Sequence, residues 1–193
     1  MANFFVSLPR TLDFEGAYLG KDAPGGEYFM GIERSKHGDW PGWSTIAVLL
    51  KTGSTQDLLS NRTLLSELSD FYRVNYWQRL ACDHLADQNL ADELFDSAVN
   101  MGPLRTTKML QRALNALRIH KKSPLFDALK ADSVLGARTL AALEALTAVD
   151  QGADLLLKTF ESLRRQAYLE VAEQDPKFSQ YMKDWLKRVG HGA

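Results

Sequence analysis

The stretch from Asp13 to Ile32, DFEGAYLGKDAPGGEYFMGI, changes the pattern of a chain whose apolar residues otherwise recur at helical spacing. Glu15 ends a helical pattern, and Gly16 follows it directly. Gly25-Gly26 then permits a tight turn, because glycine adopts backbone conformations that other residues disfavour. The run from Glu27 to Ile32 has the composition of a short strand. The stretch therefore predicts a helix, a bend and a strand edge in close succession.

Glu15 continues an apolar stripe of the preceding helix. Steps of three or four residues place on one face Phe5, Leu8, Leu12 and Glu15. We expect this helix to begin near Ser7, a residue type that suits the capping position. A carboxyl group at the end of a buried stripe is partly desolvated, and desolvation favours the protonated form. Glu15 would then suit a general acid, which must hold a proton near neutral pH.

Asp22 supplies a second carboxyl group in a different setting. It lies in a polar, turn-rich segment, where we expect it to be ionised. Two carboxyl groups in different protonation states are the general requirement for cleaving a glycosidic bond. The simpler interpretation is that a glutamate near a helix end caps the helix, forms an ion pair or is solvated. Spacing alone does not choose between these interpretations.

A motif runs through the same stretch: Glu15-Gly16-Ala17-Tyr18, then Asp22, then Pro24-Gly25-Gly26-Glu27, then Gly31-Ile32. It resembles the signature of glycoside hydrolase family 108, the secretion-activator or phage-endolysin type of lysozyme, which begins E-G-G-Y and continues through an acidic turn to P-G-G-x-T-x-x-G-I. The chain is more loosely similar to the phage-type lysozymes. Further segments resemble the same family, the last three in a part often described as a peptidoglycan-binding domain: FYRVNYW (71–77), LFDSAVNMG (94–102), LQRALN (110–115), VLGARTLAAL (134–143) and WLKRV (185–189).

The resemblance implies an N-acetylmuramidase with Glu15 as its catalytic acid and Asp22 at the second acidic position. No metal or organic cofactor is implied. The chain departs from the pattern at Tyr28, where the family has Thr, and mildly at Ala17. In phage-type lysozymes that Thr helps to hold the attacking water. The exchange for a longer, rigid ring leaves open how water or substrate is placed.

The spacing of apolar residues predicts a mainly α fold with a short β-hairpin or irregular segment near residues 20–43, and the resemblance implies that this fold is lysozyme-like. The 193 residues, 45% of them hydrophobic, can form one sizeable core or two small domains that share an interface. We place a catalytic lobe at 1–102 and a helical, peptidoglycan-binding-like lobe at 103–193, divided at Gly102-Pro103 and packed around a glycan cleft. Asp175-Pro176 predicts a further helix start. The expected helices are 61–82, 88–101, 104–119, 137–149, 151–174 and 176–189.

The candidate substrate-binding residues are mostly aromatic: Tyr18, Tyr28, Asn100, Trp40 and Trp43. Aromatic rings can stack on sugar faces, although core packing is the usual alternative. Trp40 and Trp43 flank Pro41-Gly42, and we expect them to reach substrate from a loop. Asn100 shares a helical face with Glu93 and Asp96. That face either presents Asn100 to sugar or to Glu15 across the cleft, or is a solvated polar surface.

Other reactive residue types form no motif. His37 has no second His or Cys at ligand spacing, which favours a surface turn over a metal site. Cys82 lies in a helical pattern and suits a small buried side chain better than a nucleophile. A basic run invites a DNA-binding interpretation, but an amphipathic apolar stripe accompanies it: Arg105, Lys108, Arg112, Arg118, Lys121 and Lys122 against Met109, Leu110, Ala113, Leu114 and Leu117. We interpret these charges as the solvated face of a packed helix.

The expected partner is a peptidoglycan glycan strand, with no nucleic acid and no stable membrane insertion. A net charge of -1 gives the protein no general electrostatic attraction to nucleic acid or to an anionic membrane. The start of the sequence does not resemble a signal peptide, so we expect synthesis in the bacterial cytoplasm and action on the cell wall or periplasm after release, with a holin-like pore as the export route. Two rival functions stay open, namely a non-catalytic wall-binding or secretion-assisting module and a helical DNA-binding protein.

Overall fold

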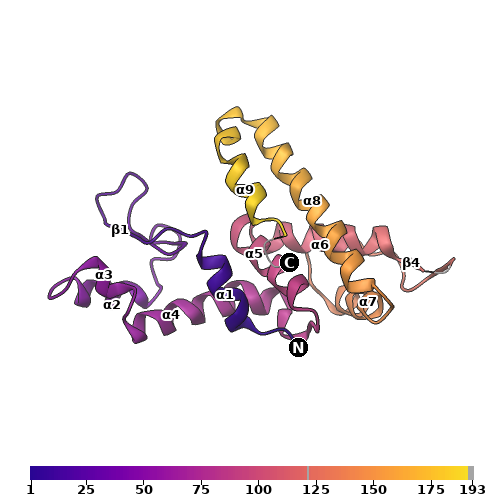
Figure 1. Ribbon diagram of the computed structural model, residues 1–193, viewed down its shortest axis with the longest axis horizontal. Helices are drawn as coiled ribbons and strands as arrows, with labels where there is room; N and C mark the ends of the chain where they lie inside the picture. Colours follow the sequence, from indigo (N-terminus) through magenta and orange to yellow (C-terminus); the bar gives the residue numbers. More distant parts are fainter. Residues whose placement is uncertain (121, 191–193) are drawn as a thin grey trace. The chain divides into compact units, whose positions relative to one another are not determined.

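The computed structural model describes residues 1–120 and 122–190 (Figure 1). The chain forms two compact units. The smaller comprises Leu8–Asn75, and the larger combines residues 1–7 with the chain from Tyr76 onward. Helices dominate both, and a small antiparallel sheet accompanies them, which confirms the predicted mainly α class.

The helix α1 (Phe4–Leu12) begins earlier than predicted. Its start is capped by Asn3, whose side-chain oxygen accepts the Phe5 N–H at 3.0 Å. Ser7 is not the cap; it is buried, and its hydroxyl donates to Asp92. The predicted apolar stripe is wrong at Phe5, which is 65% exposed while its neighbour Phe4 is buried; Leu8 is buried as predicted.

The smaller unit carries a three-stranded antiparallel sheet in the order β1-β2-β3. The strands are β1 (Tyr18–Leu19), β2 (Tyr28–Phe29) and β3 (Ile32–Glu33). The predicted single strand from Glu27 to Ile32 is wrong, because it folds back on itself at Met30-Gly31. Both turn residues have positive φ, 42° and 88°. A two-residue turn of this kind matches the twist of a hairpin and pairs Phe29 with Ile32.

Three helices complete the smaller unit: α2 (Gly42–Leu49), α3 (Thr55–Leu58) and α4 (Arg62–Tyr72). Asn61 caps α4 by accepting the Leu64 N–H at 3.0 Å. The predicted helix 61–82 is too long. A π-helical segment (Arg73–Trp77) and short 3-10 helices (Gln78–Leu80 and Cys82–His84) follow α4, and Ala81 between the 3-10 helices has φ of 52°, a left-handed conformation that interrupts an α-helix.

The larger unit is built around α5 (Gln88–Met101), in which every residue from Leu90 to Ala98 is buried. A helix that is buried on all sides must be covered by several neighbours. The helices α6 (Pro103–Leu117) and α8 (Gly152–Gln174) pack on α5 and on each other. Three further elements pack on these helices: α7 (Ala137–Thr147), the 3-10 segment η4 (Pro176–Tyr181) and α9 (Met182–Arg188). A small hairpin of β4 (Ile119–His120) and β5 (Ser123–Pro124) follows α6 in the sequence.

The predicted helix starts in this unit are confirmed. Pro103 occupies the first turn of α6, directly after Gly102. The Asp175 side chain accepts the Lys177 N–H at 3.2 Å, although the segment that it caps begins as a 3-10 helix. The limits of α5 agree with the predicted 88–101. The expected division of the chain into lobes at Gly102-Pro103 stays a prediction.

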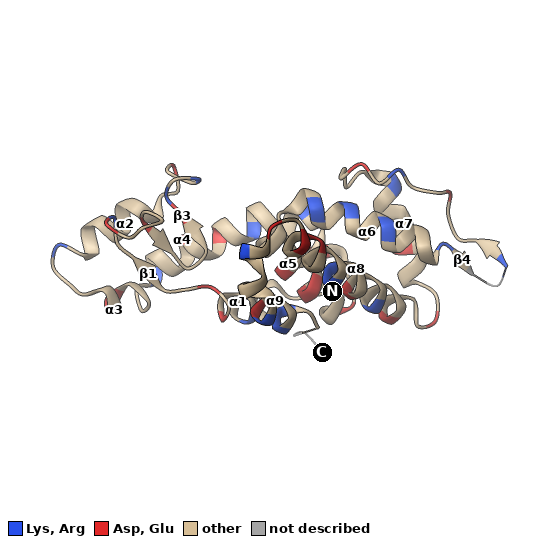
Figure 2. Ribbon diagram, turned by 90° about the horizontal axis from the view of Figure 1, so that it is seen from above, with Lys and Arg blue, Asp and Glu red and all other residues tan. Residues whose placement is uncertain are grey.

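Half of the basic run, namely Arg105, Lys108 and Arg112, lies on α6, where Figure 2 shows positively charged segments along the helix. Lys108 and Arg112 are exposed, whereas Met109, Leu110 and Ala113 are buried. The interpretation of these charges as the solvated face of a packed helix is therefore confirmed for Lys108 and Arg112, whereas Arg105 is half-buried and donates to the Ala167 carbonyl at 3.1 Å; Lys121 lies outside the described residues. Over the ranges that the structure covers, none of the helices combines the length and apolar character needed to cross a bilayer.

Candidate active site

Glu15 lies in the turn that follows α1, not on the helix itself. The helix ends at Leu12, and Glu15 donates its N–H to the Leu12 carbonyl at 3.0 Å. The side chain is half-buried and faces the hairpin of β2 and β3. The Tyr28 hydroxyl donates to Glu15 Oε2 at 3.3 Å. The structure thus brings together two of the residues predicted for the site.

Gly31 gives the Glu15 carboxyl group its space. A Cβ atom on Gly31 would lie 3.2 Å from Glu15 Oε2 and 2.0 Å from the Tyr72 hydroxyl oxygen. Tyr72 is buried and donates its hydroxyl to the Met30 carbonyl at 2.7 Å. The carboxyl group therefore packs against the main chain of the hairpin turn. Only glycine leaves room there and tolerates the positive φ.

The pKa of the Tyr28 hydroxyl is raised above its usual value of about 10. Burial is the largest cause, and the negative charge of Glu15 adds to it. Main-chain amides at Gly31 and Gly16 act in the opposite direction. The phenol consequently stays protonated at neutral pH and can donate a hydrogen bond to a carboxylate.

Tyr18, Glu27 and Arg34 form a second polar cluster on the same sheet. Glu27 is buried, receives the Tyr18 hydroxyl at 2.9 Å and pairs with Arg34 Nη1 at 2.6 Å. Burial, followed by the hydrogen bond and charge of Glu27, raises the pKa of Tyr18 to about 12. Sequence reasoning missed Glu27 as a structural residue, although it stands inside the motif; nothing in its spacing marks it as buried.

Asp22 lies exposed in the loop between β1 and β2, which agrees with the polar turn predicted for it. Among the residues that the structure describes, it makes no hydrogen bond or ion pair. Its carboxylate is therefore available to solvent. Within the described part of the chain, no hydrogen bond or ion pair joins Asp22 to Glu15, so the place of Asp22 in the reaction stays a prediction.

Trp40 and Trp43 are buried in the smaller unit, and the prediction that they reach substrate from a loop is wrong. Trp43 lies in α2 and donates its indole N–H to the His37 carbonyl at 2.6 Å. Trp40 donates to the Glu67 carbonyl at 3.1 Å and stacks on Phe29. Their amphipathic rings fill the core while each indole N–H finds a main-chain acceptor.

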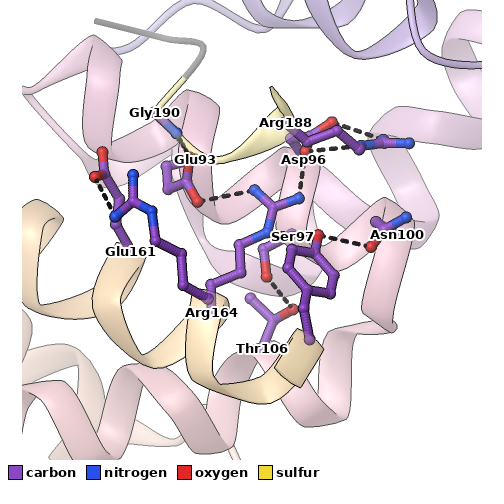
Figure 3. A network of polar contacts seen from close by, with 11 residues as sticks. Glu93, Asp96, Ser97, Asn100, Thr106, Glu161, Arg164, Arg188 and Gly190 are labelled. Atoms are coloured by element: carbon purple, nitrogen blue, oxygen red, sulfur yellow. Dashed lines mark hydrogen bonds and ion pairs between the residues drawn. The ribbon is translucent and has the colours of Figure 1, made fainter. Parts of the chain in front are cut away.

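Asn100 belongs to a buried polar network of the larger unit (Figure 3). The interpretation as a solvated surface is wrong, because α8 covers the part of the face that carries Glu93 and Asp96; Asn100 is half-buried, and its contact with sugar or Glu15 stays a prediction. Arg164, fully buried on α8, donates to Glu93 at 2.8 Å and to Asp96 at 2.5 Å. Tyr168 donates its hydroxyl to Asn100 Oδ1 at 2.8 Å. The face is thus a helix-helix interface.

The chain's C-terminal helix closes the same network. Arg188 Nη2 donates to Asp96 at 2.7 Å, and the Gly190 N–H donates to Glu93 Oε2 at 3.0 Å. Burial would raise the pKa of Asp96, but the charges of Arg164 and Arg188 outweigh it and lower that pKa. For Glu93, burial dominates and raises the pKa despite Arg164. These carboxylates hold the fold together and are not placed for catalysis.

The remaining candidates are structural. Cys82 is fully buried, and burial raises the pKa of its thiol far above the usual value. It is a buried core residue, as the sequence predicts. The His37 ring packs edge-on against Phe71 at 4.8 Å and is half-buried, so it is less solvated than the predicted surface turn.

Residues 8–102 match the family model described as glycosyl hydrolase 108, and residues 105–190 match a model described as predicted peptidoglycan domain. No curated protein matches the chain. The solved structure of Brucella abortus SagA is similar, with 27% sequence identity, coverage of 98% of this chain and 90% of that one, and a TM-score of 0.63.

The two family matches together span nearly the whole chain and identify a peptidoglycan-related protein of lysozyme-like fold. The first of them contains Glu15, the hairpin and α5. The second contains the helices that cover α5. The segment 8–102 therefore belongs to the glycosyl hydrolase 108 family, and a predicted peptidoglycan domain follows it.

Proposed function

We propose that the protein is a peptidoglycan hydrolase, an N-acetylmuramidase that cleaves the β-1,4 bond between N-acetylmuramic acid and N-acetylglucosamine. The observation that carries this proposal is the position of Glu15. Its carboxyl group is half-buried, packs against the hairpin turn at Gly31 and contacts the Tyr28 hydroxyl. It lies within the segment that matches a glycosyl hydrolase family.

In this reaction Glu15 is the general acid. It gives its proton to the glycosidic oxygen while the bond from that oxygen to the anomeric carbon breaks, which prevents expulsion of an unprotonated alkoxide. Asp22 is solvent-exposed, and it stabilises the positive charge that develops on the sugar or helps to position water. The stereochemical outcome depends on the separation of the two carboxyl groups in the substrate complex.

The decisive experiment measures release of muropeptides from purified sacculi by wild type and Glu15→Gln. Removing a general acid lowers the rate by about 10²- to 10⁴-fold. Asp13→Asn is the matched control, because Asp13 is an exposed carboxylate next to the same turn. We expect it to retain wild-type activity. Equal activity of wild type and Glu15→Gln would overturn the assignment of Glu15.

Product analysis then tests the bond that is cleaved. Borohydride reduction of the released fragments converts the new reducing end to its alditol. An N-acetylmuramidase yields muramitol, whereas cleavage of the other glycosidic bond yields glucosaminitol. Finding only the latter would overturn the proposed bond specificity without affecting the role of Glu15.

A second candidate function is a non-catalytic wall-binding or secretion-assisting module. It is favoured by Tyr28, which stands where the family pattern has Thr, and by the absence of any described contact between Asp22 and Glu15. The same experiment separates the two functions. Co-sedimentation with sacculi, together with no release of fragments by either wild type or Glu15→Gln, would support the binding module.

A further inference from the structure

The Tyr28 hydroxyl is held between a main-chain donor and the proposed acid. A phenolic oxygen has one proton to donate and lone pairs with which to accept. The Gly16 N–H donates to this oxygen at 3.2 Å, and the hydroxyl donates in turn to Glu15 Oε2 at 3.3 Å. Because the Gly16 amide occupies a lone pair of the phenolic oxygen, the hydroxyl proton points toward the carboxyl group of Glu15.

The ring that carries this hydroxyl has a fixed position. Tyr28 lies on the central strand β2, opposite Leu19 on one side and Glu33 on the other. Its edge lies over Gly16, where an added Cβ would be 3.5 Å from Cε1 of the ring. Strand pairing and the absence of a side chain at Gly16 therefore set the distance from the hydroxyl to Glu15.

We propose that Tyr28 is a positioning residue for Glu15, whose carboxyl group it orients by holding Oε2 through its hydroxyl. This inference rests on the proposed function. The proton passes from Glu15 to the glycosidic oxygen, and the electron pair of the broken bond stays on that oxygen. Glu15 is left as a carboxylate, which the Tyr28 O–H stabilises without giving up its own proton.

This role replaces the predicted contact between Tyr28 and substrate. A residue that only bound sugar would present its hydroxyl to solvent, whereas this hydroxyl is occupied within the protein. Burial and the neighbouring charge raise the pKa of Tyr28, so the phenol remains a donor over the working pH range. Tyr28 is also the residue at which the chain departs from the family pattern.

The first test is the pH dependence of sacculus hydrolysis by Tyr28→Phe, which keeps the ring and removes the donor. Losing a hydrogen bond to an ionised group lowers kcat about tenfold, with KM unchanged. The donor stabilises the ionised, inactive form of the acid, so its loss extends activity to higher pH. We expect the alkaline limb of the kcat profile to move upward by up to about one pH unit.

Tyr18→Phe is the control for this limb. It removes a hydroxyl from the same sheet, but that hydroxyl bonds Glu27 instead of Glu15. Whatever the effect of Tyr18→Phe on the rate, the alkaline limb of its kcat profile should coincide with that of wild type. An unchanged limb in Tyr28→Phe, or equal displacement in both variants, would overturn the positioning role while leaving the function tested by Glu15→Gln intact.

A second readout does not depend on activity. Tyrosines labelled with ¹³C at Cζ report phenol ionisation by NMR, and Tyr28→Phe assigns the signal of Tyr28. Because the Glu15 charge helps to raise the pKa of Tyr28, that phenol should titrate at lower pH in Glu15→Gln. Identical titration in both proteins would overturn the contact. An inactive wild type would overturn the proposed function, and this role with it.

Discussion

Gly31 is the position in the candidate active site that least tolerates a side chain. Its φ of 88° disfavours any side chain, and a Cβ there would be 2.0 Å from the Tyr72 hydroxyl oxygen. We predict that Gly31→Ala destabilises the protein by about 1–2 kcal/mol from backbone strain alone. Displacement of Glu15 should also abolish most hydrolysis of sacculi. Thermal unfolding and the muropeptide assay measure these effects independently.

Gly25→Ala is the matched control for that substitution. Gly25 lies in the same motif, but its φ is not in the left-handed region and an added Cβ would meet nothing within 4 Å. We expect its stability to stay within about 0.5 kcal/mol of wild type, as for most surface substitutions. If Gly31→Ala behaved like Gly25→Ala, the close packing of Glu15 on the hairpin turn would be refuted.

From the sequence alone, Tyr28 can be recognised as a departure from the family pattern, but the direction of its hydroxyl cannot be predicted. The motif reveals that a tyrosine stands where threonine is expected. The direction of its hydroxyl depends on the pairing of β2 with β1 and β3 and on the turn that returns Glu15 to the sheet. Neither is encoded in the spacing of the two residues.

Among the helices, α5 is held in place by ion pairs with arginines of other helices. Its Glu93 and Asp96 bond Arg164 of α8, and Asp96 also bonds Arg188 at the end of α9. Helical periodicity correctly puts the two carboxylates on one face. Periodicity alone suggests that this face is exposed to solvent, because isolated carboxylates are rarely buried. Buried arginine partners reverse that conclusion.

Arg164→Met tests this network. The substitution leaves two carboxylates buried with less compensation, and breaking a buried ion pair in this way costs about 3–5 kcal/mol. We expect a loss of that order in the free energy of unfolding, measured with urea at pH 7. Arg165→Met is the control, since Arg165 is 44% exposed and pairs with Glu161 along the same helix. Comparable losses in the two variants would contradict a special role for Arg164.

At the scale of the whole molecule, the compact units do not follow the order of the sequence. The smaller unit, Leu8–Asn75, is inserted into the larger one, which also contains residues 1–7. The family match that ends at residue 102 includes α5, yet α5 packs with α6 and α8 inside the larger unit. The segment matched as a peptidoglycan domain therefore lacks its central helix when taken alone.

Two fragments test this consequence. Fragment 103–193 leaves Arg164 and Arg188 without Glu93 and Asp96, and we predict that it has no cooperative unfolding transition. Fragment 76–193 restores α5, so it should unfold cooperatively, although at a lower temperature than the full chain because Phe4 no longer packs on Trp77 and Phe95. Circular dichroism and the dispersion of amide NMR signals distinguish these states. A well-folded 103–193 would refute the prediction.

The sequence by itself determined the mainly helical class, the limits of α5, the starts of α6 and η4 and the family motif around Glu15. These features are local, since periodicity, caps and glycine turns act over a few residues. Tertiary structure alone decided that Trp40 and Trp43 are buried, that Tyr28 faces Glu15 and that the charged face of α5 is covered. Burial and pairing depend on contacts between distant segments, as between Arg164 and Glu93, which are 71 residues apart, and local spacing carries no record of them.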